Sequence, residues 1–314
     1  MPERLGPPRE EPLFRRLAIV GFGLIGSSIA RAAKRLNLAQ RIVAVDRDEA
    51  VLERVRALSL ADETTADPAE GARGADHVIL CVPVGGYEAV VRAMRGVLSS
   101  GCIISDVGSV KGAVVAAVQP HLPGGVHFVP AHPVAGTEHS GPDAGFATLF
   151  HNRWCILTPP EGTDEKAVDK VRDFWAAMGA NVEVMTAQHH DLVLAITSHV
   201  PHLIAYNIVG TAADLETVTQ SEVIKFSAGG FRDFTRIAAS DPTMWRDVFL
   251  NNKEAVLEML GRFNEDLASL ARAIRWGDGD ALFNLFARTR TIRRGIISEG
   301  QETPEPDFGR RRES

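Results

Sequence analysis

The stretch AIVGFGLIGSSIA, residues Ala18 to Ala30, decides the fold of this chain of 314 residues. It begins as an apolar run typical of a buried strand and ends by opening a helix-like segment. Between the two stand Gly21, Gly23 and Gly26, in the spacing G-x-G-x-x-G. In a dinucleotide-binding turn the first glycine makes the tight bend, the second admits a pyrophosphate, and the third lets helix and strand pack closely. The helix start then offers free N–H groups and a positive dipole end to the phosphates.

Asp46 strengthens this motif, which is a weak signal when it stands alone. Asp46 ends a second apolar run, RIVAVD, and follows Gly26 by 20 residues. A carboxylate at this place accepts hydrogen bonds from the adenosine ribose hydroxyls of NAD and repels the 2′-phosphate of NADP. We therefore expect NAD as the cofactor, while the neighbouring Arg47 keeps NADP open. The opposing interpretation is a glycine turn that binds nothing.

Strand-like and helix-length segments alternate through the first part of the chain. The apolar runs are Arg16 to Val20, Arg41 to Asp46, His77 to Val84, Cys102 to Val107 and His127 to Ala131. This alternation predicts parallel strands joined by crossover helices, and the continuous hydrophobicity predicts strands covered on both faces. Two further strands, Trp154 to Pro160 and Asn181 to Thr186, are expected to flank a helix from Asp164 to Met178. The fold class is therefore an α/β Rossmann domain, placed at residues 15–186.

The remainder of the chain is expected to be helical, because strand-like runs stop at Thr186 while helical apolar spacing continues. We place this helical domain at residues 187–298. Its later segments are Val218 to Lys225, Phe234 to Ala239, Pro242 to Trp276 and Gly279 to Ile297. The solvated face of the last helix carries Arg288, Arg290, Arg293 and Arg294. Polar and proline-bearing ends predict disordered tails at 1–14 and 299–314.

The composition excludes several classes of protein. A net charge of −6 and a pI near 5.9 give no general attraction to nucleic acid, so small molecules are the expected partners. Cys81, Cys102 and Cys155 lie in apolar, strand-like runs, which suits reduced thiols better than a disulfide framework. We find no signal-like N-terminus and no apolar run of about 18 residues, so a membrane span is not expected. The expected location is the cytoplasm.

Two polar loops follow later strands of the predicted sheet, at Ser105 to Gly112 and at Pro130 to Gly141. Both should open onto the nicotinamide end of the crevice, where the carboxyl ends of the strands meet. A hydride donor that bears a hydroxyl needs a base for the hydroxyl proton, and His132 suits that task. A turn histidine at the surface is the alternative. Ser109 is a second candidate, which either hydrogen-bonds the same hydroxyl or caps the helix that follows.

The helical part offers further polar residues. Arg236 is suited to clamp a carboxylate, with a surface ion pair to Asp233 or Asp241 as the alternative. Trp245 is most often a core or interface residue at such a place. His199 and His202 have the spacing of a ligand pair, but Pro201 disturbs the helix between them and no third ligand stands out, so no metal is expected.

Five motifs in order resemble the prephenate dehydrogenase family. They are GFGLIGSS, DVGSVKG, HPVAGTEHSG, SHVPH and GGFRDFTRIAASDPTMWRD, and the resemblance runs roughly from Leu17 to Ile297. It implies a Rossmann domain followed by a helical domain that dimerises. The implied reaction is the NAD-dependent oxidative decarboxylation of prephenate to 4-hydroxyphenylpyruvate, or of arogenate to tyrosine. The implied partners are these substrates, tyrosine as an inhibitor and a second copy of the chain.

The resemblance also implies roles for single residues. His132 would accept the proton of the ring hydroxyl, Ser109 would hydrogen-bond that oxygen, and Arg236 would bind a substrate carboxylate. The substrate pocket would be lined by His202, Ser198 and Thr137, with Glu138, Asp233 and Arg236 as an ionic network at its mouth. Trp245 would lie at the dimer interface. The cofactor would contact Gly21, Gly23, Leu24, Ile25, Gly26, Asp46, Arg47, Val82 and Pro83.

Two rival functions stay open. A β-hydroxyacid dehydrogenase has a similar two-part layout but needs a catalytic lysine in a helix of its second domain, where this chain has Lys225 and Lys253 without a recognisable motif. An NAD-responsive binding protein would need neither a base nor an anion clamp. We also expect no appended regulatory or mutase segment, so that tyrosine inhibition would have to act at the active site itself.

Overall fold

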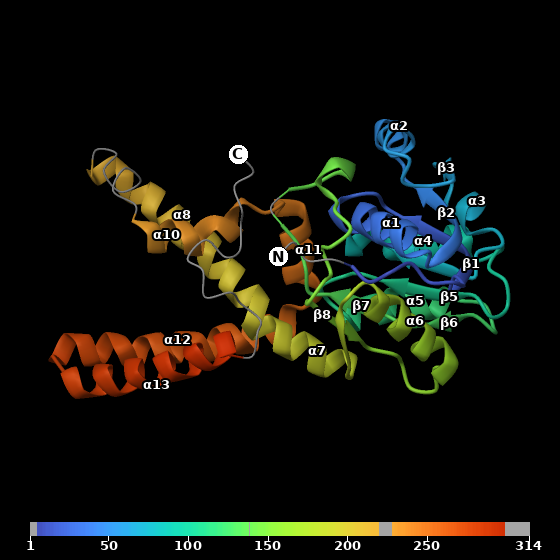
Figure 1. Cartoon of the computed structure of the whole chain (residues 1–314). Coiled ribbons are helices and arrows are strands. Elements are labelled where there is room, and N and C mark those ends of the chain that lie inside the picture. The colour runs from blue at the N-terminus through green and yellow to red at the C-terminus, as the bar shows by residue number, and fades with distance from the viewer. Residues whose placement is uncertain (1–4, 138, 220–227, 299–314) are drawn as a thin grey trace. The chain divides into compact units, whose positions relative to one another are not determined.

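The computed structural model describes residues 5–137, 139–219 and 228–298 and divides the chain into two compact units. The first unit runs to Val256 and contains every strand of the described chain, whereas the second begins at Leu257 and is helical (Figure 1). Each unit is described by itself below.

Six strands of the first unit form a parallel sheet in the order β3-β2-β1-β4-β5-β6. They are β1 (Phe14–Val20), β2 (Ala39–Val45), β3 (Glu63–Thr65), β4 (His77–Leu80), β5 (Ile103–Asp106) and β6 (His127–Phe128). This is the strand order of a Rossmann sheet, with its switch point between β1 and β4. Val20 pairs with both Val45 and Leu80, and Leu80 pairs with Asp106, so four strands end at one edge of the sheet. The predicted fold class is confirmed, although the short polar strand β3 was not anticipated.

Helices cover both faces of this sheet, as the apolar strands require. They are α1 (Leu24–Leu36), α2 (Glu49–Ala57), α3 (Pro68–Ala72), α4 (Tyr87–Met94), α5 (Gly112–Val118) and α6 (Glu165–Ala177). Alternate residues of β1 enter two separate cores: Leu17 and Ile19 join one, and Ala18 and Val20 join the other. Since side chains of a strand point to opposite faces in turn, this division confirms that the strands are buried on both sides.

The run His127 to Ala131 does not form the single strand expected from its sequence. It divides into β6 and β7 (Ala131–Pro133), and β7 joins a second sheet with β8 (Trp154–Leu157) and β9 (Asn181–Val184). Pro130 is the physical cause, because it has no N–H for the first sheet, and its carbonyl accepts a hydrogen bond from the Thr158 N–H at 2.9 Å. The β7–β8 pair is antiparallel, whereas all strand pairs of the first sheet are parallel, as predicted for that sheet.

The described part of the N-terminal segment is ordered against the first unit, contrary to the expected tail at 1–14. Leu5 is buried in the core, and the Arg9 N–H donates to the Leu36 carbonyl at 2.9 Å. The Asn37 side chain donates in turn to the Arg9 carbonyl at 2.9 Å. An apolar anchor and hydrogen bonds to the end of α1 therefore hold a segment whose proline content suggested disorder.

Helices follow β9 to the end of the described chain, as predicted. They are α7 (Ala187–Leu194), a π-helical turn (Ala195–His199), α8 (Val200–Thr219), α10 (Gly229–Thr235), α11 (Pro242–Asn251), α12 (Lys253–Trp276) and α13 (Gly279–Ser298). Short 3₁₀ turns lie at Val84–Gly86, Gln119–His121, Pro142–Ala144 and Arg236–Ala239. The expected helix Pro242 to Trp276 is interrupted at Asn252, which departs from helical backbone angles. Most of the expected segment Val218 to Lys225 lies outside the described residues.

One helical stretch meets the length and hydropathy of a membrane span, contrary to our expectation from the sequence. Ala187–Leu215 has a mean hydropathy of 1.5 in its most apolar window, of which 28% is buried. Core helices of globular proteins pass the same test. In this stretch His190 and Asp191 are hydrogen-bonded to one another, and Asp191 accepts the Lys111 N–H, so these two polar residues have partners within the chain.

Candidate active site

The glycine turn has the geometry that a dinucleotide requires. Gly21 has a φ of +100°, and a Cβ there would lie 2.7 Å from the Cys81 carbonyl oxygen. A Cβ on Gly26 would lie 2.0 Å from the Gly21 carbonyl oxygen, whereas a Cβ on Gly23 would meet nothing within 4 Å. Two glycines are thus needed for packing, and the third leaves open space for a ligand. Helix α1 has no side-chain cap and no acidic residue in its first turn, so its N–H groups are available to phosphates.

Asp46 lies beside this turn, at the carboxyl end of β2. Its Oδ2 accepts the Phe22 N–H at 2.9 Å, and its Oδ1 accepts the Asp48 N–H at 3.0 Å. The carboxylate is therefore fixed, half-buried, within reach of a ligand that lies on the glycine turn. Arg47 is exposed next to it. These residues fit the adenosine half of a dinucleotide, with amides for the phosphates and a carboxylate for the ribose.

The other expected cofactor contacts lie along the same edge of the sheet. Leu24 is buried and Ile25 half-buried in the first turn of α1. Val82 and Pro83 follow the end of β4, and a Cβ on Gly21 would come within 3.0 Å of the Val82 N atom. The structure therefore brings together the predicted contacts of the turn and of the neighbouring strand.

His132 lies on β7, buried, and belongs to a chain of three polar side chains. Its Nδ1 is 2.8 Å from Nε2 of His190, and Nδ1 of His190 is 2.8 Å from Oδ1 of Asp191. Burial lowers the pKa of His132 well below its usual value, and the nearby His190, Lys111 and His199 lower it further. A histidine in this state is neutral and able to accept a proton.

Asp191 joins this chain to the start of α5. Its two carboxylate oxygens accept the Lys111 N–H at 2.7 Å and the Gly112 N–H at 2.8 Å. Although burial raises the pKa of Asp191, the hydrogen bonds from His190, Gly112 and Lys111 bring the pKa below its usual value. Asp191 is therefore an ionised carboxylate, and it caps α5 from a distant helix.

Ser109 is half-buried in the loop between β5 and α5. It does not cap α5, because the first residues of that helix bind Asp191 instead and Lys111, at the N-cap, makes no side-chain cap. This removes the capping alternative. The same loop carries a fully buried ion pair, in which Lys111 Nζ lies 2.5 Å from Oδ2 of Asp106 and 2.7 Å from the Ala131 carbonyl oxygen.

His199 and His202 lie on successive turns around the π-helical segment. Nδ1 of the buried His199 accepts from the Asn252 side chain at 3.1 Å, and the same amide donates to the Asp191 carbonyl at 2.9 Å. Nδ1 of His202 donates to the Ser198 carbonyl at 2.8 Å. Because π-helical turns often mark functional sites, this local irregularity supports the assignment of the segment to the site.

Trp245 stacks on His202 within the same chain. The ring centroids are 3.7 Å apart, the planes are inclined by 24°, and the indole is 6% exposed. The indole therefore packs against one face of the His202 ring. Within the single chain little of this side chain is exposed, and its place at a dimer interface stays a prediction.

The remaining substrate candidates are more open. Ser198 is half-buried, whereas Thr137, Asp233 and Arg236 are exposed. Arg236 lies near enough to His202 to lower its pKa, adding to the effect of burial. Glu138 lies outside the described residues. The structure therefore brings Arg236, His202 and Ser198 into one region and leaves the expected ionic network at the mouth as a prediction.

Several residues of this site were missed in the sequence. His190, Asp191 and Asn252 carry no motif that distinguishes them from ordinary helix residues, and only the fold brings them to His132 and His199. In the part of the chain that the structure describes, no group of three His, Cys, Asp or Glu side chains is placed to hold a metal ion. Lys253 is exposed at the start of α12, which does not support a catalytic lysine there, and Lys225 lies outside the described residues.

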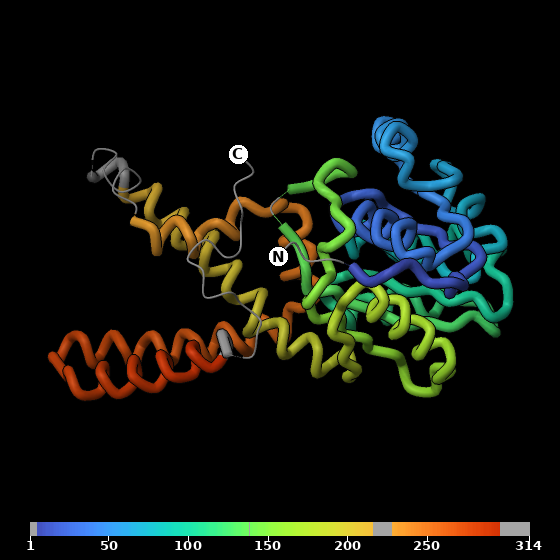
Figure 2. The backbone as a smooth tube through the Cα atoms, viewed as in Figure 1, coloured from blue at the N-terminus to red at the C-terminus, as the bar shows by residue number. Residues whose placement is uncertain are grey.

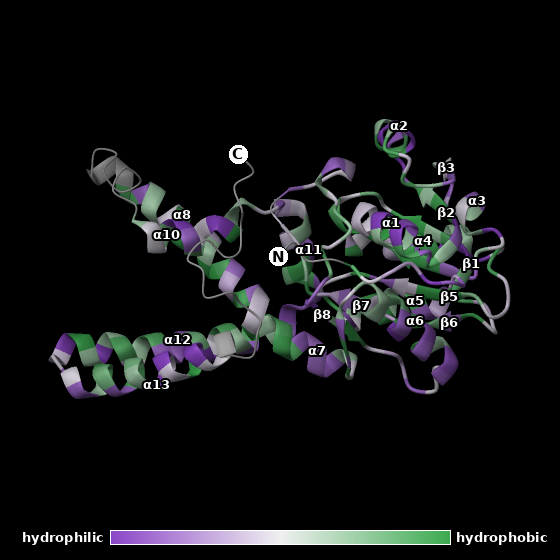
Figure 3. Ribbon diagram, viewed as in Figure 1, coloured by the Kyte–Doolittle hydropathy of each residue, from purple (hydrophilic) through white to green (hydrophobic). Residues whose placement is uncertain are grey.

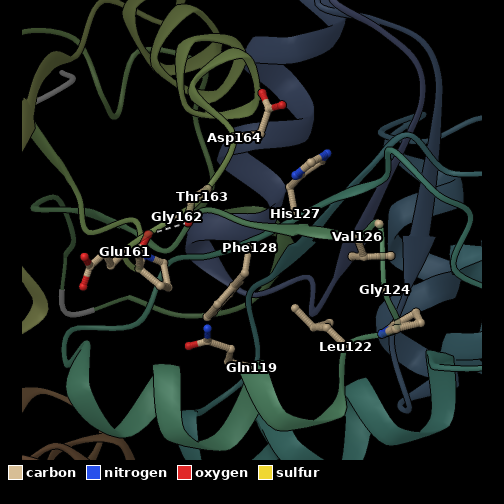
Figure 4. Close-up of a pocket in the computed structure, with 13 residues that line it drawn as sticks. Gln119, Leu122, Gly124, Val126, His127, Phe128, Glu161, Gly162, Thr163 and Asp164 are labelled. Carbon is tan, nitrogen blue, oxygen red and sulfur yellow. Dashed lines mark hydrogen bonds between the residues drawn. The ribbon is translucent and has the colours of Figure 1, made fainter.

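A separate shallow pocket of about 250 Å³ lies at the opposite end of the sheet, where β6 begins (Figure 4). It is lined by Gln119, Leu122, His127, Glu161 and Asp164 among others. His127 is the first residue of its strand, whereas His132 follows the carboxyl end of that strand. The pocket is therefore not part of the candidate active site.

Comparison with known proteins agrees with this geometry. Family models described as the nucleotide-binding domain and the dimerization domain of prephenate dehydrogenase match residues 29–184 and 186–288. The chain is 43% identical to the cyclohexadienyl dehydrogenase of Zymomonas mobilis over 93% of this chain and 99% of that protein. It is 33% identical to the prephenate dehydrogenase of Bacillus subtilis over 89% of this chain and 76% of that protein.

Solved structures give the same result. Prephenate dehydrogenase from Aquifex aeolicus, in complex with hydroxyphenyl propionate and NAD⁺, superposes with a TM-score of 0.84 at 33% identity, over 90% of this chain and 98% of that chain. Arogenate dehydrogenase from Synechocystis superposes with a TM-score of 0.76 at 26% identity, over 90% and 99% of the two chains. The chain therefore belongs to the prephenate dehydrogenase family of NAD-dependent oxidoreductases.

Proposed function

We propose that this enzyme oxidatively decarboxylates both prephenate, to 4-hydroxyphenylpyruvate, and arogenate, to tyrosine. The observation that carries the proposal is His132, a buried and neutral histidine that follows the carboxyl end of β6 and lies at the edge of the sheet with the glycine turn. Its Nε2 has no hydrogen-bond partner among the described residues. The Zymomonas mobilis relative is named for the cyclohexadienyl group that both substrates share, which supports dual use.

Bound NAD accepts the hydride from the ring carbon that carries the hydroxyl group. In the proposed role, His132 Nε2 takes the hydroxyl proton as that C–H bond breaks. The substrate carboxylate leaves as CO₂, its electron pair completes the aromatic ring, and the proton returns to the ring oxygen. Because aromatisation supplies much of the driving force, the protein has mainly to align the reactants, bind anions and provide a base. Ser109 supports the ring oxygen with a hydrogen bond.

The helical side of the site is proposed to bind the rest of the substrate. Arg236 holds a carboxylate, and His202, Ser198 and Thr137 line the pocket. Asp233 and Glu138 complete an ionic network with Arg236 at its mouth. Trp245 supports His202 by the stacking described above. Tyrosine, which is itself the product of the arogenate reaction, is proposed to inhibit by competing at this same site.

We further propose that the enzyme is a cytoplasmic homodimer. The match to a dimerization domain at residues 186–288 supports this, as do the exposed apolar side chains of α12 and α13. Under this proposal the base, the clamp and the stacked pair belong to one subunit, and the stacking of Trp245 on His202 of its own chain supports that assignment.

The experiment that tests the function is steady-state NADH or NADPH formation with each substrate and each cofactor. We expect turnover of prephenate and arogenate, and a higher kcat/KM with NAD than with NADP because of Asp46. His132→Asn should bind substrate as tightly in calorimetry but lose about 10²- to 10⁴-fold in kcat. Binding of NAD without turnover of either substrate would favour the rival binding protein, and full activity of His132→Asn would exclude His132 as the base.

A further inference from the structure

The chain from Asp191 to His132 has a single consistent arrangement of protons. An ionised carboxylate only accepts hydrogen bonds, so the proton between Asp191 and His190 resides on Nδ1 of His190. Burial keeps the pKa of His190 below its usual value, so His190 is neutral and its Nε2 is an acceptor. The proton between the two imidazoles therefore resides on Nδ1 of His132, and the lone pair of His132 is on Nε2.

Hydrogen bonds to Asp191, at the end of the chain away from His132, hold this arrangement of protons in place. Asp191 accepts three hydrogen bonds, from His190 and from the N–H groups of Lys111 and Gly112, while Asn252 binds its carbonyl oxygen. If the carboxylate turned toward a different partner, the N–H groups of Lys111 and Gly112 at the start of α5 would lose their acceptor. The backbone of α5, which follows the Ser109 loop, is thus fixed by the same carboxylate that sets the protons of the two histidines.

We propose that His190 and Asp191 are positioning residues that hold His132 in the tautomer with a free Nε2 and stabilise it once that atom has taken the substrate proton. The inference rests on the proposed function, in which His132 is the base. The proton taken from the hydroxyl binds Nε2, the Nδ1 proton stays between the two imidazoles, and the positive charge on His132 faces His190 and the carboxylate beyond it. No proton needs to leave the site, because it returns to the ring oxygen.

The charged and titratable groups around His132 come from several elements. Some of them favour the protonated form of His132 and others disfavour it. Lys111 at the N-cap of α5 and His199 on the π-helical turn oppose a positive charge on His132. Asp191 on α7 favours it through His190, and it is joined to His190 by a direct hydrogen bond. Removal of the Asp191 charge therefore leaves the protonated base facing only groups that disfavour it.

The direct test of this proposal is the proton position on His132, measured by long-range ¹⁵N–¹H NMR of histidine-labelled enzyme. We expect a protonated Nδ1 and a bare Nε2 in the wild-type enzyme. His190→Phe removes the acceptor and should shift His132 toward the other tautomer, whereas the exposed neighbour His189→Phe should not. A proton on Nε2 in the wild-type enzyme would overturn the proposal. This measurement does not depend on turnover, so it is separate from the test of the function.

The kinetic test distinguishes positioning from a purely structural role. His190→Phe and Asp191→Asn should lower kcat on the order of 100-fold, leave the substrate KM within about twofold, and move the acid limb of the kcat–pH profile. A variant that merely loosens the packing would lower the melting temperature and keep the profile. An unchanged kcat, or a change in KM alone, would contradict the proposal. If His190→Phe does not fold, His190→Gln replaces it. The NMR measurement of the His132 tautomer in the wild-type enzyme tests the proposal in either case.

Discussion

The sheet-bearing unit and the α12–α13 unit bury their apolar side chains to very different degrees. Leu17, Ile19 and Trp175 of the first unit are fully buried, whereas Trp276 and Phe283 of the second are 77% and 71% exposed. Helix α13 folds back along α12 after a turn at Gly277 (Figure 2), and apolar residues occur along both helices (Figure 3). The sheet of the first unit thus completes its core within one chain, although helices of that unit also expose Leu215 and Leu250. The second leaves apolar surface that the proposed dimer would cover.

The polar interactions differ in the same way. The first unit contains the buried Lys111–Asp106 pair, while α12 carries an exposed Arg262–Glu258 pair one helical turn apart. A buried ion is costly to leave unpaired, but an exposed pair contributes little. Stability of the first unit should therefore depend on single buried groups, and stability of the second should depend on its partner. Four measurements test this contrast.

Lys111→Met should have the strongest consequence. It leaves the Asp106 carboxylate buried without its cation and removes the donor to Ala131, next to His132. We expect a loss of about 3–5 kcal/mol in the free energy of unfolding, measured in urea at fixed protein concentration. The exposed Lys166→Met is the matched control and should change little. Equal stability of the two variants would contradict the contrast between buried and exposed charges.

Arg236→Ala should affect binding without affecting stability, because Arg236 is exposed. Loss of a charged hydrogen bond to a carboxylate is worth about 1.5–3 kcal/mol, so the substrate KM should rise about 10- to 100-fold. The melting temperature should stay within about one degree of wild type. Arg262→Ala is the control on α12. A substrate KM near the wild-type value would remove Arg236 as the clamp.

His77 makes the first unit sensitive to acid. It is fully buried, its Nε2 lies 2.8 Å from the Ser105 hydroxyl oxygen, and burial lowers its pKa to about 3. The unfolded chain, with an ordinary histidine pKa of about 6.5, takes up this proton first. Stability from His77 is therefore complete above about pH 6.5 and is lost as the pH falls, by about 2 kcal/mol between about pH 7 and pH 5.

Urea unfolding across that pH range checks this expectation. His77→Phe should be less stable near neutrality, because the buried Ser105 hydroxyl loses its partner, but its stability should depend less steeply on pH. His189→Phe provides the exposed control. The same slope in both variants would show that another group causes the acid sensitivity.

Phe283→Ser should have the mildest effect, confined to association. Phe283 is exposed in the single chain, and its burial in the proposed dimer is worth about 1–2 kcal/mol. The dimer dissociation constant should therefore rise about tenfold, as measured by sedimentation velocity in a dilution series. The neighbouring Asn284→Ser is the control. Unchanged association of Phe283→Ser would place the dimer interface elsewhere.

The local patterns of the sequence were reliable where the backbone itself imposes the pattern. Gly21 and Gly26 must be glycines because a Cβ at either position would clash with backbone. Asp46 lies at the end of the second strand, where its carboxylate reaches the glycine turn. The spacing of these three residues along the chain was therefore enough to predict the cofactor turn. The interruption at Asn252 was missed, because asparagine is tolerated in a helix and its two hydrogen bonds reach residues 53 and 61 positions away. The division at Pro130 was missed for a similar reason, since its carbonyl binds Thr158 in a different strand.

The sequence by itself determined the Rossmann domain, the cofactor turn, the helical second part and the family, because glycine spacing, strand alternation and five ordered motifs are all local or linear properties. Only the tertiary structure decided how the base is held. His132, His190 and Asp191 come from two segments 58 residues apart, and α5 takes its cap from that same carboxylate. Proton positions depend on which donors and acceptors meet in space. No spacing along the chain encodes that meeting.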